Sequence, residues 1–271
     1  MVVRGVHPAP VEIPDAVHAL AGWYVGWGSV TPVWRNDLGG LTFRLQDAGF
    51  PPPGATTPGR PAQYLKWVPE GAPCPDPVAE AGRLRWVSPF TRVPEVVDAG
   101  RGDDGAWLLT QERAGISAID PRFRDDPRTA TRSVAEGLRL LHDAAPVASC
   151  PFLWTPESRT AALPDAVRAG IGEPPPVDRL VVCHGDPCVP NTLLHDDGSF
   201  AAHVDVGELG VADRWSDLAV ASRSVVRRFR DPGLEAEFLA AYGVVPDPER
   251  VAYYRTLWDV VEHHRRRRRP R

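Results

Sequence analysis

Lysine and asparagine are nearly absent from this chain. Of its 31 basic residues one is a lysine, Lys66, and 30 are arginines, while asparagine occurs twice, at Asn36 and Asn191. A general preference for arginine can reflect genomic composition, so a position that keeps lysine is informative. Lysine offers a compact ammonium and arginine a broad planar fork, and the two are not interchangeable at a tight phosphate site. Lys66 is therefore a candidate for specific chemistry.

Long apolar runs and paired cysteines are also missing. No apolar run approaches the roughly 20 residues that a membrane helix needs, and residues 1–14 show no basic segment followed by an apolar one, so we expect no signal peptide. The four cysteines contain no CxxC pair, and we expect free thiols in a cytoplasmic protein, with a disulfide as the alternative. At 271 residues, 43% hydrophobic and 24% charged, the composition is typical of one large domain or two lobes.

Charge is unevenly distributed along the chain. The formal net charge is −4, but residues 265–271 contain six arginines, and the remainder has 25 basic against 35 acidic residues, a net charge of −10. An acidic body attracts small cationic molecules rather than nucleic acid. The arginine run alone would indicate nucleic acid or an anionic membrane, but we expect a solvated, disordered tail.

The first part of the chain, residues 1–112, is rich in glycine, proline and β-forming stretches. Its expected strands are 23–30, 41–46, 63–68, 93–98 and 106–110. One helix is expected among them, with Asp76 as its N-cap and Pro77 at its first position. Residues 51–61 have no helix or strand pattern and predict a loop. This part therefore predicts a small sheet that carries one helix.

The remainder of the chain is mostly helical in pattern. Capping signals predict helix starts at 126–127, 213, 231–232 and 247–248. Two short strands, 180–183 and 201–206, are expected to flank a turn at 196–198 and to form a hairpin inserted in the helical part.

The polar residues that indicate chemistry lie around this hairpin. Asp186 follows a strand, Asn191 comes five residues later, and Asp205 ends the next strand. Carboxylate and amide oxygens that converge from neighbouring strand ends suit Mg²⁺, and a carboxylate outside that shell is free to accept a proton. Asp196 and Asp197 are expected as ordinary turn residues.

This stretch resembles the catalytic core of the aminoglycoside phosphotransferases, antibiotic kinases related to protein kinases. Members carry HGDxxxxN followed by DxGxxGxxDRxxDLA, and the chain has both patterns. The resemblance implies that Asp186 accepts the proton of the acceptor hydroxyl and that Asn191 and Asp205 bind Mg²⁺. It also implies that Asp213 and Asp217 brace the catalytic loop.

The resemblance extends to the first part of the chain, and thus over about residues 20–262. Lys66 lies in an expected strand and Glu80 follows 14 residues later in the expected helix. The resemblance implies that Lys66 binds the nucleotide phosphates while Glu80 holds its ammonium. It further implies that Thr110 and Glu112 lie in the strand and hinge that bind the adenine. The alternative for Lys66 is an ordinary surface lysine.

The chain also departs from the family pattern. No GxGxxG covers the phosphates, and Glu208 stands where many relatives carry arginine. In the relatives, acids that close the last helix bind the drug; Asp259 matches one of them, but the next such position is Val260. We therefore expect Asp259 to bind the substrate and the acceptor range to be narrow.

Together these patterns predict an α+β protein with a two-lobed, protein-kinase-like fold. We expect a nucleotide-binding lobe at 1–112, a catalytic and acceptor-binding lobe at 113–264, and a tail at 265–271. The expected activity is Mg²⁺-dependent transfer of the γ-phosphoryl of ATP or GTP to a hydroxyl of a cationic aminoglycoside, with no nucleic-acid or membrane partner. Three alternatives stay open: a kinase of another hydroxylated antibiotic or metabolite, a nucleotide-binding protein without turnover, and a nucleic-acid module.

Overall fold

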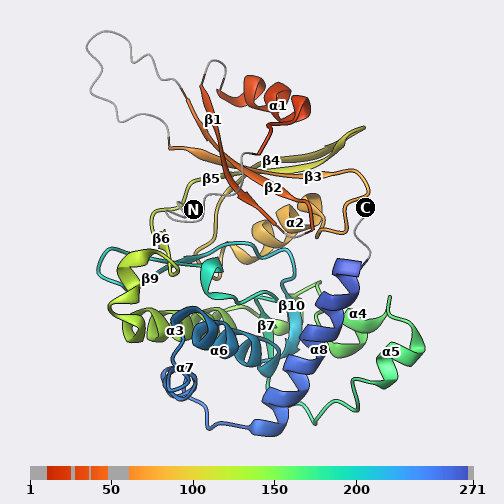
Figure 1. Ribbon diagram of the computed structural model, residues 1–271, viewed down its shortest axis with the longest axis vertical. Helices are drawn as coiled ribbons and strands as arrows, with labels where there is room; N and C mark the ends of the chain where they lie inside the picture. Colours follow the sequence, from red (N-terminus) through yellow and green to blue (C-terminus); the bar gives the residue numbers. More distant parts are fainter. Residues whose placement is uncertain (1–10, 26–27, 37, 48–60, 268–271) are drawn as a thin grey trace.

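A five-stranded antiparallel sheet forms the first lobe of the protein, at the top of Figure 1. The computed structural model describes residues 11–25, 28–36, 38–47 and 61–267. The sheet order is β1-β2-β3-β5-β4. Its strands are β1 (Ser29–Arg35), β2 (Leu41–Gln46), β3 (Gln63–Pro69), β4 (Val96–Gly102) and β5 (Gly105–Gln111).

A helix covers each face of this sheet. Helix α1 (Asp15–Val25) packs its buried residues against apolar side chains of β2, β3 and β5, including Leu65. Helix α2 (Pro77–Val87) packs on Leu108. Because side chains alternate across a strand, Lys66 and its register partner Leu108 face away from α1, toward the second lobe.

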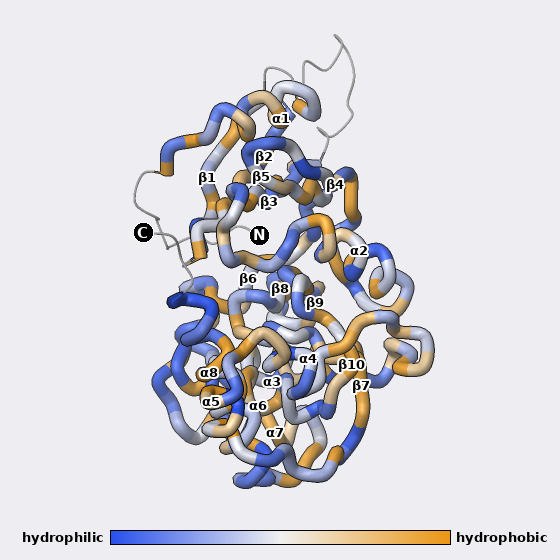
Figure 2. Tube along the Cα trace, turned by 90° about the vertical axis from the view of Figure 1, so that its right-hand side faces the viewer, coloured by the Kyte–Doolittle hydropathy of each residue, from blue (hydrophilic) through white to orange (hydrophobic). Residues whose placement is uncertain are grey.

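The second lobe is built on four long helices and two small sheets (Figure 1). The helices are α3 (Pro127–Ala144), α6 (Trp215–Phe229), α7 (Leu234–Tyr242) and α8 (Pro248–Arg267), with short α4 (Pro156–Thr160) and α5 (Asp165–Ala169) beside them. The short strands are β6 (Ile116–Ser117), β7 (Leu180–Cys183), β8 (Thr192–Leu194), β9 (Phe200–His203) and β10 (Gly210–Asp213). The 3₁₀ turns are η1 (Pro121–Arg124), η2 (Val147–Ser149) and η3 (Val189–Asn191). Figure 2 shows hydrophobic segments inside this lobe and hydrophilic residues at the end of α8.

The capping signals are confirmed at most predicted helix starts. The Asp76 carboxylate accepts a hydrogen bond from Val78 N at 3.0 Å, and Asp126 accepts one from Thr129 N at 3.1 Å. Asp213 Oδ1 accepts a hydrogen bond from Trp215 N at 2.9 Å, although the N-cap residue of α6 is Arg214. Each carboxylate satisfies a backbone donor that the first helical turn leaves unpaired.

Two predicted strands of the first lobe are wrong or displaced. Residues 23–25 end helix α1, β1 begins only at Ser29, and residues 26–27 between them lie outside the described residues. Val17, Ala21 and Val25 are spaced as on one face of a helix, and this face packs on the sheet. The aromatic residues Trp23 and Tyr24, which favour a strand, hide this spacing in the sequence. The strand expected at 93–98 instead runs from Val96 to Gly102.

The predicted hairpin of the second lobe is also wrong in its pairing. Strand β7 pairs with β10, while β8 and β9 flank the turn at 196–198. Sequence analysis missed β8 and β10 because all their residues are buried, so they show no alternation of polar and apolar side chains.

The arginine-rich segment is not wholly a disordered tail. Helix α8 continues through Arg267, so residues 265–267 are helical, and residues 268–271 lie outside the described residues, as does most of the predicted loop at 51–61. None of the helices in the described residues is both long and apolar enough to cross a bilayer. The four cysteines all lie in the described part of the chain, and none forms a disulfide.

Candidate active site

A pocket of about 510 Å³ receives residues from both lobes. Its lining includes six residues that sequence analysis proposed: Lys66, Glu80, Thr110, Asp186, Asn191 and Asp205. Strand β3 and helix α2 supply the first two, and the loops that follow β7 and β9 supply three of the others. These six residues are up to 139 positions apart in the chain.

Lys66 is held between two carboxylates. Its Nζ lies 2.5 Å from Glu80 Oε2 and 2.6 Å from Asp205 Oδ1. Burial of the ammonium opposes its charge, but the carboxylates of Asp205 and Glu80 outweigh this and raise the pKa of Lys66 well above its usual range. Lys66 is therefore a permanently charged anchor and not the surface lysine of the alternative interpretation.

Asp205 has an unusual backbone conformation. Its φ is +62°, in the left-handed region that few residues other than glycine, asparagine and aspartate adopt readily. Desolvation opposes ionisation of its carboxyl, but the charge and hydrogen bond of Lys66 prevail and lower its pKa. An ionised carboxylate is thereby presented to the pocket.

Asp186 and Asn191 lie between β7 and β8, on the segment expected to be the catalytic loop, and are linked by a hydrogen bond. Asn191 Nδ2 donates to the backbone oxygen of Asp186 at 3.0 Å, which leaves the amide oxygen of Asn191 as a potential ligand. Asp186 Oδ1 is buried and has no hydrogen-bond partner among the described residues. Burial, and next the charge of Asp205, raises the pKa of Asp186 to about 6. An unpaired carboxylate oxygen in the pocket is poised to accept a proton.

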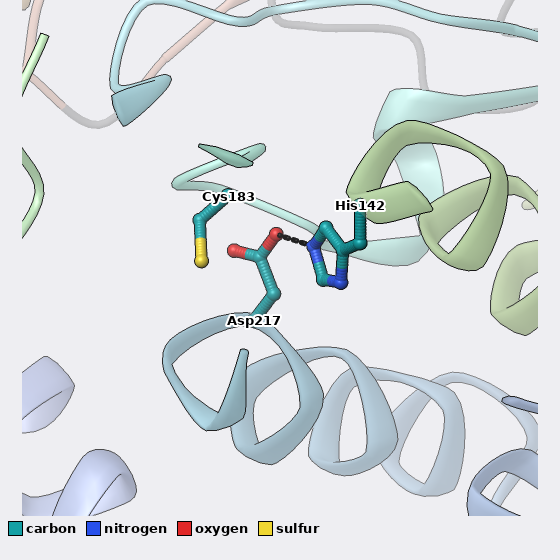
Figure 3. Close-up of side chains that lie close together, drawn as sticks. All are labelled: His142, Cys183 and Asp217. Carbon is teal, nitrogen blue, oxygen red and sulfur yellow. Dashed lines mark hydrogen bonds and ion pairs between the residues drawn. The ribbon is translucent and has the colours of Figure 1, made fainter. Parts of the chain in front are cut away.

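A buried carboxylate beneath the pocket braces the catalytic loop. Asp217, on α6, accepts hydrogen bonds from the backbone N–H groups of His184 at 2.6 Å and Gly185 at 3.1 Å, and lies 3.0 Å from His142 Nε2 (Figure 3). The Cys183 thiol lies in the same cluster. Because the oxygens of Asp217 are already used by the loop and by His142, this cluster supports the loop rather than reacting.

Glycine is required where the loop passes its neighbour. Gly185 has a φ of +87°, and a Cβ atom there would come within 2.2 Å of the backbone oxygen of Glu208. Only glycine allows this approach without displacing one of the two segments. The HGD motif therefore fixes the loop against the segment that follows Asp205.

Two predicted residues have side chains that are used elsewhere. Glu112 forms an ion pair with Arg44 at 3.1 Å and accepts a hydrogen bond from Tyr64, and it is not among the described residues that line the pocket. Asp259 forms an ion pair with Arg223 at 2.8 Å, and the described lining includes its helix neighbours Trp258 and Glu262 but not Asp259.

Sequence analysis missed Glu262, Arg265 and Trp258. All three come from α8 and line the pocket. Their spacing of three and four residues places them on one face of a helix, and this is the signal from which they could have been found. Trp258 and Glu262 lie close to Asp259, the acid that matches the family pattern, and Arg265 opens an arginine run that is typical of a solvated tail.

The donor set of the pocket fits a magnesium ion. Asn191 and Asp205 supply an amide and a carboxylate oxygen, and hard oxygen ligands are those that Mg²⁺ prefers. When bound, Mg²⁺ would neutralise charge on the nucleotide phosphates. The Lys66–Glu80 pair, the Asp186 loop and Asp205 together define a kinase-type phosphotransferase site on a two-lobed fold.

Comparisons with known proteins agree with this class. A model of the phosphotransferase enzyme family matches residues 165–254. Streptomycin 3''-kinase of Streptomyces griseus is 33% identical over 92% of this chain and 96% of its own length. An aminoglycoside 3'-phosphotransferase of Streptomyces fradiae is 30% identical over 82% of this chain and 91% of its own length. The chain belongs to the aminoglycoside phosphotransferase family.

Solved structures confirm the protein-kinase-like α+β fold. Aminoglycoside phosphotransferase APH(3'')-Id from Streptomyces rimosus superposes with a TM-score of 0.71 at 28% identity, over 91% of this chain and 98% of that one. The same enzyme in complex with ADP and streptomycin gives a TM-score of 0.66.

Proposed function

We propose that this protein transfers the γ-phosphoryl group of ATP to a hydroxyl of streptomycin or a closely related aminoglycoside. The observation that carries the proposal is the meeting of Lys66, Glu80 and Asp205 with Asp186 and Asn191 in one pocket. The choice of streptomycin as the acceptor is supported by the similarity to streptomycin 3''-kinase over nearly the full length of both chains.

Each side chain has a defined part in this reaction. Lys66 binds the nucleotide phosphates and Glu80 keeps its ammonium in place. Asp186 accepts the proton of the acceptor hydroxyl while that oxygen forms its bond to the γ-phosphorus, and the bond to the β-phosphate oxygen breaks to release ADP. Asn191 and Asp205 would hold Mg²⁺. Thr110 and Glu112 are proposed at the adenine side, where Thr110 lines the pocket.

The acidic character of the body supports a cationic acceptor. Apart from residues 265–271 the chain has a net charge of −10, which attracts polyamine sugars and repels nucleic acid. We infer a cytoplasmic location, because the reaction consumes ATP. Asp259 remains a prediction as an acceptor-binding residue.

A turnover assay tests the proposal. Purified protein is given Mg²⁺ with ATP or GTP and a panel of acceptors that includes streptomycin, other aminoglycosides and neutral hydroxylated antibiotics. We expect ADP release and a phosphorylated product with streptomycin, and a fall of about 10²- to 10⁴-fold in kcat for Asp186→Asn with little change in the nucleotide KM. Asp196→Asn, at an exposed turn, is the matched control.

Two results would contradict the proposal. Turnover confined to neutral acceptors would exclude the aminoglycoside and leave the kinase chemistry in place. Full activity of Asp186→Asn would exclude Asp186 as the base.

A further inference from the structure

The acceptor side of the pocket contains a cation supplied by the chain itself. Arg265, in the last turn of α8, lies 3.0 Å from Glu208 Oε2 and 3.1 Å from Glu262 Oε1. All three side chains are mostly buried, and all three line the pocket that contains Asp186. Figure 1 shows how the end of α8 rises toward the first lobe.

The two carboxylates come from different parts of the chain. Glu208 lies three residues after Asp205, and Glu262 lies on α8, so they meet only in the folded protein. Partly desolvated carboxylates close to each other need a cation, because water solvates them poorly there. Arg265 supplies it, and its planar guanidinium can bind both at once.

A second guanidinium limits how many cations this cluster can hold. Arg159 stacks on Trp154 with its guanidinium 4.5 Å from the ring centre, and it also lies over Trp258. Its Nε and Nη1 are buried and have no hydrogen-bond partner among the described residues. Burial, and next the charge of Arg265, lowers the pKa of Arg159 to about 10. The cluster thus has two guanidinium groups for two carboxylates, so a further cation enters only if one leaves.

Arg265 is the group that can leave. Arg159 is buried and lies over two tryptophan rings. Arg265 lies over one of them, Trp154, at the longer distance of 5.9 Å, is on the last described turn of its helix and is repelled by Arg159. A change of side-chain rotamer moves its guanidinium away without unwinding α8. With Arg265 withdrawn, the cluster has one net negative charge and faces the pocket.

We propose that Arg265 fills, in the acceptor-free enzyme, the subsite for a cationic group of the acceptor, and that a guanidinium or ammonium of the acceptor displaces it. This inference rests on the proposed function, because it assumes that a cationic acceptor enters the pocket. Exchange of one cation for another keeps the charge of Glu208 and Glu262 balanced. The acceptor then binds only the fraction of molecules in which the subsite is open, which raises its KM. A planar guanidinium matches the subsite best, since it reproduces the group it replaces.

Steady-state kinetics of Arg265→Ala tests the proposal. We expect the acceptor KM to fall by about threefold to tenfold, with kcat and the nucleotide KM nearly unchanged. Arg265→Lys keeps the charge but cannot bridge both carboxylates as a fork, so its acceptor KM should lie between those of wild type and Arg265→Ala. Arg267→Ala, an exposed residue of the same arginine run, is the matched control and should behave as wild type.

Methylguanidinium provides a second readout. It should inhibit Arg265→Ala competitively against the acceptor, at concentrations that leave the wild type unaffected, because the vacated subsite binds it. An unchanged or raised acceptor KM in Arg265→Ala, with an active wild type, overturns the proposal and shows that Arg265 only organises the two carboxylates. Melting curves accompany each variant, and if Arg265→Ala does not fold, the intermediate KM expected of Arg265→Lys decides.

Failure of the proposed function is recognised separately. If the wild type phosphorylates no acceptor, that function is wrong. Calorimetric binding of streptomycin to the wild type and to Arg265→Ala then decides this inference by itself. Tighter binding to the variant supports it, and equal or weaker binding overturns it.

Discussion

At two places in the same pocket a cation lies between two carboxylates. At the nucleotide side Lys66 lies between Glu80 and Asp205, and at the acceptor side Arg265 lies between Glu208 and Glu262. The first cation is anchored in the middle of a strand and has a compact head. The second is at the end of a helix and has a long, movable side chain.

In the proposed reaction, this difference lets one arrangement serve two purposes. A phosphate chain is an anion, so the cation that binds it must remain in place and already be charged. A cationic acceptor needs the carboxylates themselves, so the cation that occupies them must leave. Placement in a rigid strand or at a helix end decides between these outcomes.

The largest effect is expected from the brace that lies beneath the pocket. Asp217→Ala removes the acceptor of two backbone N–H groups and leaves His142 buried without its carboxylate partner. We expect a loss of about 3–5 kcal/mol in the free energy of unfolding, measured by urea denaturation, because two backbone N–H groups and the His142 ring each lose a buried hydrogen-bond partner, at about 1–3 kcal/mol each. Turnover with every acceptor should fall as well, because the catalytic loop loses its support. If Asp217→Ala were as stable as the wild type, the proposed support of the loop by Asp217 would be wrong.

The same residue makes a prediction for pH. Burial opposes ionisation of Asp217, but its hydrogen bond to His142 prevails and lowers its pKa. The folded state then binds fewer protons than the unfolded one, so its contribution to stability is present above about pH 4 and is lost as the pH falls further. The difference in stability between wild type and Asp217→Ala should therefore narrow in acid.

The next largest effect is expected at the nucleotide cluster, which is formed by Lys66, Glu80 and Asp205. Asp205→Asn keeps the shape and tolerates the left-handed backbone, but it removes the charge that would hold Mg²⁺ and Lys66. We expect kcat/KM to fall by about 10²- to 10³-fold while the melting temperature changes little. Retention of most of the activity would show that Asp205 is not a metal ligand.

Lys66→Arg tests whether the compact head matters. A planar guanidinium does not fit between Glu80 and Asp205 as an ammonium does, so the nucleotide KM should rise by roughly tenfold. Glu80→Ala should give a similar defect, and the double variant should be less impaired than the two single effects predict. If Lys66→Arg left the nucleotide KM unchanged, the compact ammonium of Lys66 would not be required at this position.

The smallest effect is expected from the acids of α8. Glu262→Gln weakens the binding of the acceptor, which raises the acceptor KM, and also weakens the binding of Arg265, which lowers it. Because these two effects oppose each other, the acceptor KM of the otherwise wild-type enzyme should change little. In the Arg265→Ala background the full loss of about threefold to tenfold should emerge. Asp259 is paired with Arg223, so Asp259→Asn should raise the acceptor KM less than Glu262→Gln does in that background.

The nucleotide cluster could be predicted from sequence because its members carry local signals. Lys66 stands out as the single lysine, Asp186 and Asn191 belong to one short pattern, and Asp205 opens a second pattern. Helix starts were predictable for the same reason, since a capping aspartate acts within its own turn.

The features that could not be predicted, the pairing of β7 and the role of Arg265, depend on contacts between distant segments. The pairing of β7 with β10 joins two short strands that are buried except at Leu180, and nothing local shows which strand is the partner. The ion pair of Arg265 with Glu208 joins positions 57 residues apart, in a segment that has the appearance of a solvated charge run. Such contacts follow from tertiary packing, which a single sequence does not display.

The position of Lys66 has a consequence for chemical labelling. A chain with one lysine has a single side-chain amine, so an acylating reagent directed at amines can report on this pocket and, otherwise, only on the α-amino group. Because Glu80 and Asp205 raise the pKa of that amine, its neutral, nucleophilic form is scarce and its acylation should be slow. Loosening either carboxylate should speed the labelling, which would make the rate of acylation a direct measure of how firmly the phosphate-binding side of the pocket is assembled.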